Sequence, residues 1–165
     1  MQIVLFEPEI PPNTGNVARL SAAARVPLHL IEPLGFRIED RYLKRAGLDY
    51  WPHVRLKIWS NLDSFFAQEE FLQKARPRFV ATSARQGEPV HHFAFKSDDI
   101  LFFGPETRGL PSAVLEQMDS LVRIPIRGAV RSLNLSTAVG IVLYQALAAS
   151  GELDHWPAED SEGCC

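Results

Sequence analysis

Short apolar segments alternate with longer mixed segments along the chain. Segments that predict strands cover residues 2–6, 28–31, 54–59, 79–82, 100–103 and 121–124. Segments that predict helices cover residues 13–24, 41–46, 60–74, 111–118 and 134–149. Adjacent apolar residues leave a strand with no polar face, which is typical of burial. Because strands and helices alternate, we expect an α/β fold, a parallel sheet with helices on both faces.

Prolines and capping residues predict several of the element boundaries. Pro8, Pro11 and Pro12 indicate a fixed loop after the first strand, because proline lacks an N–H donor. Asn13 or Thr14 then caps the first helix. The alternating segment 54–59 predicts an edge strand, Ser60 or Asn61 caps the helix after it, and residues 84–92 predict a polar loop.

The helix predicted at residues 134–149 is apolar on nearly all sides. Its polar side chains form a narrow strip: Ser136, Thr137, Tyr144 and Gln145. Such a helix is buried on more than one side, either as a central core helix or as a dimer interface. We favour the dimer, because the last helix of a domain this small normally faces water.

The length of 165 residues suits one domain, residues 1–150, followed by an acidic tail, residues 151–165, that we expect to be flexible. No apolar segment approaches the ~20 residues of a membrane span, and no signal peptide precedes the first strand. We therefore expect a cytoplasmic protein. Cys164 and Cys165 are adjacent and cannot cross-link a core. A metal site made of these thiols and His155 is disfavoured, and we predict no metal.

The net charge of −3 gives no global basic field of the kind that marks many nucleic-acid-binding proteins. The stretch from Glu152 to Glu162 contains acidic residues and neither lysine nor arginine. The rest of the chain is therefore slightly basic, and a local phosphate-binding patch remains compatible with the composition. Composition alone neither establishes nor excludes RNA as a partner.

Three polar turns, residues 13–19, 102–111 and 131–136, combine arginine with glycine or asparagine. Glycine lets bare backbone approach a ligand, and ligands of parallel sheets bind beyond the C-terminal ends of the strands. Asn13 and Asn16 at a helix N-terminus favour an anionic ligand group. Helix caps, together with a surface arginine at position 19, explain the first turn equally well, and caps at Ser132 and Asn134 explain the third.

Other candidate groups are weaker. Arg41, Lys44 and Arg45 share one face of a short predicted helix, and a solvated face is the usual explanation for such a cluster. The histidines lack metal partners at suitable spacing, and no Ser-His-Asp, HExxH or CxxC arrangement occurs. Hydrolase and metalloenzyme functions therefore have little support.

Taken together and in this order, PNTGNVAR, FGPETRGLP and RSLNLSTAVGIVLYQAL resemble the three motifs of the SPOUT methyltransferases. The surrounding IVLFEPEIPPNTGN, IEPLGF and RAGLDYW resemble the TrmL family, which methylates the wobble ribose of tRNA. The likeness covers about residues 1–148. It implies an α/β fold with a C-terminal deep trefoil knot and a homodimer formed through helix 134–149. It also implies S-adenosyl-L-methionine (AdoMet) bound in the knot, with S-adenosylhomocysteine as product.

The resemblance also implies roles for particular residues. The expected cofactor-binding residues are Ala81, Thr82, Gly104, Glu106, Gly109, Ile124, Ser132, Leu133 and Asn134. The expected substrate-binding residues are Asn13, Asn16, Arg41, Lys44, Arg45, Arg85, Arg108 and Arg131. The expected catalytic residues are Arg19, Ser136 and Tyr144. Because a guanidinium group keeps its proton in water, we interpret Arg19 first as a phosphate clamp and electrostatic stabiliser, and only second as a base.

One stretch departs from the family pattern. The run Thr82–Gly87 is longer than the Thr-Thr-Lys-Gly run that the family often has, and Arg85 takes the place of the lysine. We predict AdoMet-dependent 2'-O-methylation of the ribose at tRNA position 34, a cytidine or modified uridine. The alternatives are methylation of another tRNA or rRNA position, or a non-catalytic RNA-binding role.

Overall fold

The computed structural model describes residues 1–37, 50–68 and 76–156. Its strands are β1 (Gln2–Phe6), β2 (Leu28–Ile31), β3 (Leu56–Trp59), β4 (Phe79–Ser83), β5 (Glu88–Pro89), β6 (Ile100–Phe103) and β7 (Ser120–Arg123). Its helices are α1 (Pro11–Ala23), η1 (Trp51–His53), α3 (Leu62–Phe66), α5 (Ser112–Leu115), α6 (Leu135–Ala149) and η2 (Glu152–His155). The helix predicted at residues 41–46 lies outside the described ranges.

The strands form one parallel sheet in the order β3-β2-β1-β6-β4-β7-β5. From β1 the chain moves outward to β2 and β3, whereas from β6 it moves to β7 on the other side. The adjacent strands β1 and β6 therefore flank a topological switch point, where parallel sheets open a crevice beyond their carboxyl ends. The predicted α/β class and the edge position of β3 are confirmed.

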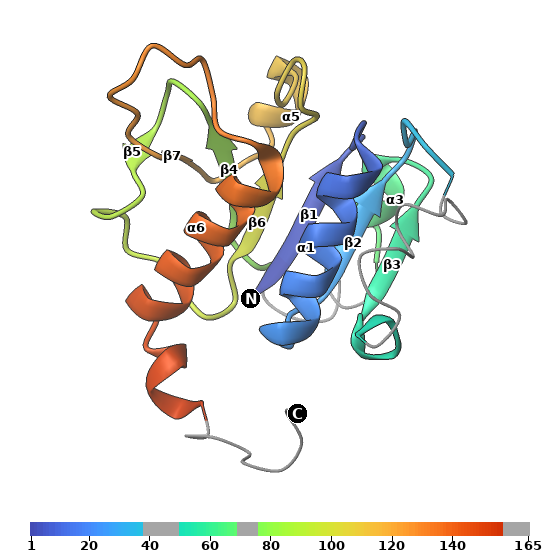
Figure 1. Cartoon of the computed structure of the whole chain (residues 1–165), viewed down its shortest axis with the longest axis horizontal. Coiled ribbons are helices and arrows are strands. Elements are labelled where there is room, and N and C mark those ends of the chain that lie inside the picture. Colours follow the sequence, from blue (N-terminus) through green and yellow to red (C-terminus); the bar gives the residue numbers. More distant parts are fainter. Residues whose placement is uncertain (38–49, 69–75, 157–165) are drawn as a thin grey trace.

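The buried strand residues alternate between two cores, one on each face of the sheet. The first core packs Ile3, Leu5, Leu28, Leu30, Val80, Leu101 and Phe103 against α1 and α6. The second packs Val4, Phe6, Ile31, Phe79, Ala81, Ile100 and Phe102 against α3 and α5. Figure 1 shows α1 and α6 side by side over one face. Helices thus cover both faces, as the sequence predicts.

Helix α1 begins two residues earlier than predicted. It starts at Pro11 with Ile10 at the N-cap position, and no side chain caps it. The first turn of a helix does not use its N–H groups internally, so Pro11 and Pro12 fit there. The expectation that these prolines form a loop, with Asn13 or Thr14 as the cap, is wrong.

Three other boundaries also differ from the predictions. Asn61 caps α3 as expected, and its Oδ1 accepts the Ser64 N–H at 2.8 Å. Helix α3 ends at Phe66, where the Gln68 amide donates to the Phe65 carbonyl at 2.8 Å, an acceptor that a continuing helix needs. Residues 69–74 of the helix predicted at 60–74 lie outside the described ranges. The predicted loop 84–92 contains the two-residue strand β5, and the helix after Pro111 ends at Leu115.

The first residues of the predicted tail have regular structure. Helix η2 packs against α6, and Leu153 joins the edge of the first core. The Trp156 ring meets that of Tyr144 edge to face, with 6.1 Å between the ring centroids. Residues 157–165, including Cys164 and Cys165, lie outside the described part of the chain.

His29 is a buried titratable group in the middle of β2, with only 2% of its surface exposed. The Trp59 indole donates to its Nδ1 at 3.0 Å, so the ring proton is on Nε2, which donates to Gln2 Oε1 at 2.7 Å. Burial lowers the pKa of His29 to about 4 from its ordinary 6.5, and the nearby Lys57 charge contributes in the same direction. The folded protein therefore holds this ring neutral.

We expect acid to destabilise the protein through His29. Between pH 6.5 and about 4 the His29 ring binds a proton in the unfolded chain but stays neutral in the folded chain. The contribution of His29 is complete above pH 6.5 and is lost as the pH falls through this window, on the order of 3 kcal/mol in all. Denaturant unfolding at pH 7.0 and 4.5 measures the change. His29→Gln should show a smaller pH dependence, and an equal one would contradict this assignment.

Candidate functional site

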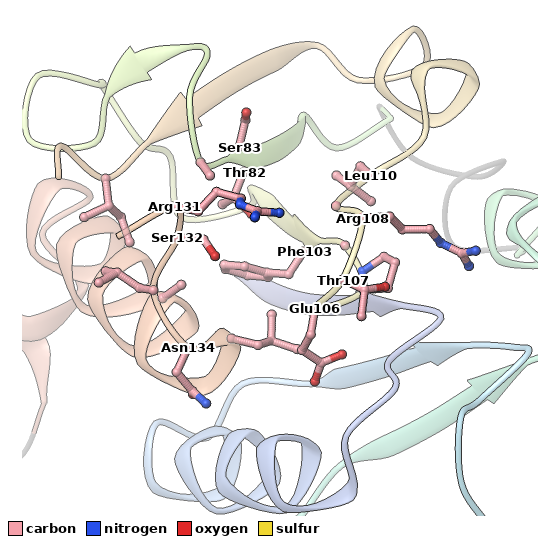
Figure 2. Close-up of a pocket in the computed structure, with 18 of the residues that line it drawn as sticks. Thr82, Ser83, Phe103, Glu106, Thr107, Arg108, Leu110, Arg131, Ser132 and Asn134 are labelled. Carbon is pink, nitrogen blue, oxygen red and sulfur yellow. The ribbon is translucent and has the colours of Figure 1, made fainter. Parts of the chain in front are cut away.

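A cavity of about 890 Å³ lies at the carboxyl edge of the sheet, beside the switch point between β1 and β6. It is lined by the loops that follow β1, β4, β6 and β7 and by the start of α6. Figure 2 shows side chains from these loops converging on one space. The volume is in the range of small-molecule and cofactor sites. The three polar turns identified in the sequence therefore meet at one place.

The loop between β6 and α5 folds back on itself. A Cβ added at Gly104 would lie 2.3 Å from the Leu110 backbone nitrogen, and Gly109 has a φ of +69°. The Gly109 N–H closes the turn on the Pro105 carbonyl at 3.0 Å. Only glycine fits at position 104 without moving the backbone, so the loop presents bare backbone to the cavity.

A chain of hydrogen bonds joins the three motifs. Asn13 Nδ2 donates to Glu106 Oε1 at 2.9 Å, and Asn134 Nδ2 donates to Asn13 Oδ1 at 2.9 Å. The backbone N–H of Glu9 donates to Glu106 Oε2 at 2.9 Å. Both carboxylate oxygens of Glu106 thus accept bonds from the chain itself. Its observed contacts are those of a residue that holds the loop, α1 and α6 in register.

Two more contacts hold the same loop to the segment after β1. The Thr107 N–H and hydroxyl donate to the Glu9 carboxylate at 3.0 and 2.8 Å. Arg108 forms an ion pair with Glu7. Figure 2 shows the Arg108 guanidinium pointing away from the cavity, so its charge pairs with Glu7 at the rim and does not face the interior.

Asn134 begins α6 and is its N-cap, as expected. Its Oδ1 accepts from the Ser136 N–H at 2.9 Å and from the Ser136 hydroxyl at 2.8 Å. Ser136 is therefore bonded to the cap and does not line the cavity. The mid-helix Gly140 lies against α1, because a Cβ there would be 3.9 Å from the Leu20 side chain.

The structure brings most of the predicted site residues together. The cofactor set lines the cavity at Thr82, Gly104, Glu106, Gly109, Ile124, Ser132, Leu133 and Asn134. The substrate set lines it at Asn13, Arg85, Arg108 and Arg131. Ala81 is instead buried in the second core. Arg41, Lys44 and Arg45 lie outside the described residues.

Besides Ala81, four predicted residues in the described ranges are not among those that line the cavity: Asn16, Arg19, Ser136 and Tyr144. Asn16, Arg19 and Tyr144 are exposed on α1 and α6. The Arg19 guanidinium lies 5.7 Å from the centre of the Tyr50 ring, and the Tyr50 hydroxyl donates to the Gly15 carbonyl at 3.1 Å. Arg19 therefore does not line the cavity of its own chain, and its catalytic role stays a prediction.

Sequence reasoning missed the apolar wall and the acidic anchors. The cavity is also lined by Phe103, Leu110, Leu115, Ile126, Leu135 and Ala138, mostly residues at the ends of predicted elements. Glu7 and Glu9 hold the loop, as described above. Two acidic residues flanking a proline directly after a buried strand were the available signal, since this position falls at the carboxyl edge of the sheet.

The rim of the cavity carries positive charge. Within the described ranges no carboxylate pairs with Arg85 or Arg131, whereas Arg108 is paired with Glu7. Figure 2 shows Arg131 extending into the cavity from the loop before α6. Unpaired guanidinium groups beside an apolar wall suit a ligand with an aromatic or aliphatic part and an anionic part.

No helix among the described residues has the length and apolar character needed to cross a membrane. No group of three or more His, Cys, Asp or Glu side chains gathers in that part of the chain as a metal site.

Known proteins resemble this chain over most of its length. Residues 1–144 match the model of the SpoU rRNA Methylase family. The tRNA (cytidine(34)-2'-O)-methyltransferase of Yersinia pestis is 44% identical over 149 residues, which cover 88% of this chain and 91% of that protein. A solved structure described as giving insights into the 2-OH methylation of C/U34 on tRNA is 46% identical, with a TM-score of 0.83, and covers 92% of this chain and 96% of its own.

An AdoMet-bound rRNA methyltransferase from Sinorhizobium meliloti is more distant. It is 26% identical with a TM-score of 0.78, and the match covers 89% of this chain and 55% of that one. The likeness to a cofactor-bound structure agrees with the size and lining of the cavity described above.

Proposed function

Because the chain belongs to the SpoU methylase family, we propose that it methylates the ribose 2'-hydroxyl of nucleotide 34 in tRNA, using AdoMet. The observation that carries the proposal is the meeting of three motifs around one cavity, joined through Glu106, Asn13 and Asn134. The matches to the Yersinia pestis enzyme and to the structure for C/U34 methylation cover 91% and 96% of those chains. S-adenosylhomocysteine is the product that such a transfer leaves behind.

The residues present fit this cofactor. Gly104 gives the backbone access, Phe103 and Leu110 supply apolar surface, and Thr82 and Ser132 supply hydroxyl groups. When bound, AdoMet supplies an electrophilic methyl group on a sulfonium sulfur. Arg131 and Arg85 hold the anionic part of the substrate at the rim. The 2'-hydroxyl as acceptor makes the activity specific for RNA over DNA.

We further propose a homodimer through the exposed face of α6. Thr137, Ile141, Tyr144 and Ala148 are exposed at helical spacing along that face, and Ile141 and Tyr144 keep 40% and 41% of their surface. Val139, on another side of the same helix, is 0% exposed and packs in the first core. That side of the helix faces inward and is no part of the proposed interface. The implied trefoil knot stays a prediction.

Ile141→Glu should give a folded monomer with little methyl transfer. A charge in the proposed interface has no partner there, whereas in a free chain it faces water. Size-exclusion chromatography with light scattering gives the mass. The matched variant Val139→Glu buries the same charge in the core. It should lower the free energy of unfolding by roughly 3–5 kcal/mol and so unfold the chain. An Ile141→Glu protein that stays dimeric would contradict the proposed interface.

The proposed activity is tested with labelled AdoMet and, in separate reactions, total tRNA and rRNA from a strain that lacks its wobble methyltransferase. Nuclease digestion then maps the labelled nucleotide. Label at the ribose of position 34 supports the proposal. Label at another position of tRNA, or in rRNA, would show that the protein methylates that position instead. If the protein binds AdoMet but labels neither RNA, the result supports the non-catalytic RNA-binding role.

A further inference from the structure

A second hollow of about 530 Å³ opens beside the cavity. Its walls include three arginines, Arg85, Arg123 and Arg131. The two spaces share part of their lining, including Arg85, Ile124 and Arg131. A group bound in the hollow therefore lies directly beside a ligand in the cavity. Arg123 belongs to the hollow alone and is absent from the residues that sequence reasoning selected.

Arg123 is held in position by the fold. It is the last residue of β7, half-buried, and its Nε donates to the Gly87 carbonyl at 3.2 Å. Gly87 is itself fixed, because its φ is +103° and a Cβ there would lie 2.4 Å from the Leu121 carbonyl oxygen. This contact uses one of five guanidinium donors. The remaining four are available to a ligand, and less side-chain entropy is lost when one binds.

The charge around the hollow is of one sign. Among the residues that line it there is no aspartate or glutamate, and no carboxylate in the described ranges pairs with its three arginines. Its other lining residues are apolar: Ala84, Ile124, Ile126, Ala129 and Val130. Val130 is 61% exposed. Converging guanidinium groups without a counter-ion, next to exposed apolar surface, suit a phosphate that carries a nucleoside.

We propose that this hollow binds a backbone phosphodiester of the RNA next to the nucleotide being methylated, and that Arg123 is a substrate-binding residue. The inference rests on the proposed function. The chemistry follows from the position of the hollow: a ribose entering the cavity carries its two neighbouring phosphates to the rim. A phosphate held by Arg123 fixes the register of the RNA and makes no contact with a base edge.

The test is equilibrium binding of an anticodon stem-loop RNA at several KCl concentrations. Arg123→Gln should weaken binding about tenfold, as expected for the loss of one charge-assisted contact. It should also lower the slope of log Kd against log salt by about one. AdoMet affinity should not change. Arg55→Gln removes the same charge next to β3, at the opposite edge of the sheet, and should leave the Kd nearly unchanged.

A second substrate set identifies the phosphate itself. Two stem-loops each carry one neutral methylphosphonate linkage, on the 5' side of nucleotide 34 in one and on the 3' side in the other. One of the two should bind wild-type protein more weakly than the unmodified stem-loop does. Arg123→Gln should show no further loss with that RNA. If Arg123→Gln behaves like Arg55→Gln while wild-type protein binds and methylates, this inference fails alone. If wild-type protein neither binds nor methylates tRNA, the proposed function fails with it.

Discussion

Gly104→Ala should bind AdoMet far more weakly and lower methyl transfer roughly 100-fold or more, since misplacement by about 1 Å has effects of this size. The added Cβ would lie 2.3 Å from the Leu110 nitrogen and 2.4 Å from the Gly109 carbonyl carbon. Both are backbone atoms of the loop that lines the cavity. No side-chain rotation relieves the overlap, so the loop itself must open.

Titration calorimetry with AdoMet measures the loss. The matched control is Gly128→Ala, where an added Cβ meets nothing within 4 Å and φ is not in the left-handed region. Thermal unfolding of both variants separates a deformed loop from an unfolded chain. AdoMet binding by folded Gly104→Ala at wild-type affinity would show that this loop does not hold the cofactor.

The strands were the most predictable part of the fold. Residues 100–103 and 3–6 are apolar on both faces, a pattern typical of a buried parallel strand. Strand β5 has no such pattern, because Glu88 is charged and Pro89 is a proline. These two residues form a strand only by pairing with Val122 and Arg123 of β7. The start of α1 was missed for a different reason, because prolines at 11 and 12 read as a break although the first helical turn accepts them.

The candidate site was predictable as a set of loops but not as a set of contacts. Each motif follows a strand or begins a helix, so the sequence places them at one edge of the sheet. The partners of Glu106 depend on how α1 and α6 pack, and no local pattern encodes that. The same holds for Arg123, because its arginine neighbours in the hollow, Arg85 and Arg131, come from other loops.

Arg19→Ala should abolish methyl transfer while AdoMet binding is retained. Arg19 is exposed on α1 and does not line the cavity of its own chain. Helices α1 and α6 lie side by side over one face of the sheet, and α6 carries the proposed dimer interface (Figure 1). Arg19 is a predicted catalytic residue that does not line the cavity of its own chain but lies on the helix beside the proposed interface. Both facts are explained if its guanidinium acts at the cavity of a second copy.

Two inactive variants distinguish this from action within one chain. Arg19→Ala keeps an intact cavity, and Gly104→Ala keeps an intact Arg19. If Arg19 acts across the interface, a mixed dimer has one complete site, and an equal mixture of freely exchanging chains should regain about a quarter of wild-type activity. Differently tagged chains, co-expressed and purified through both tags, provide the mixed dimer for assay. If Arg19 acts in its own chain, neither subunit holds a complete site and no activity returns. Full activity of Arg19→Ala by itself would instead remove Arg19 from the reaction.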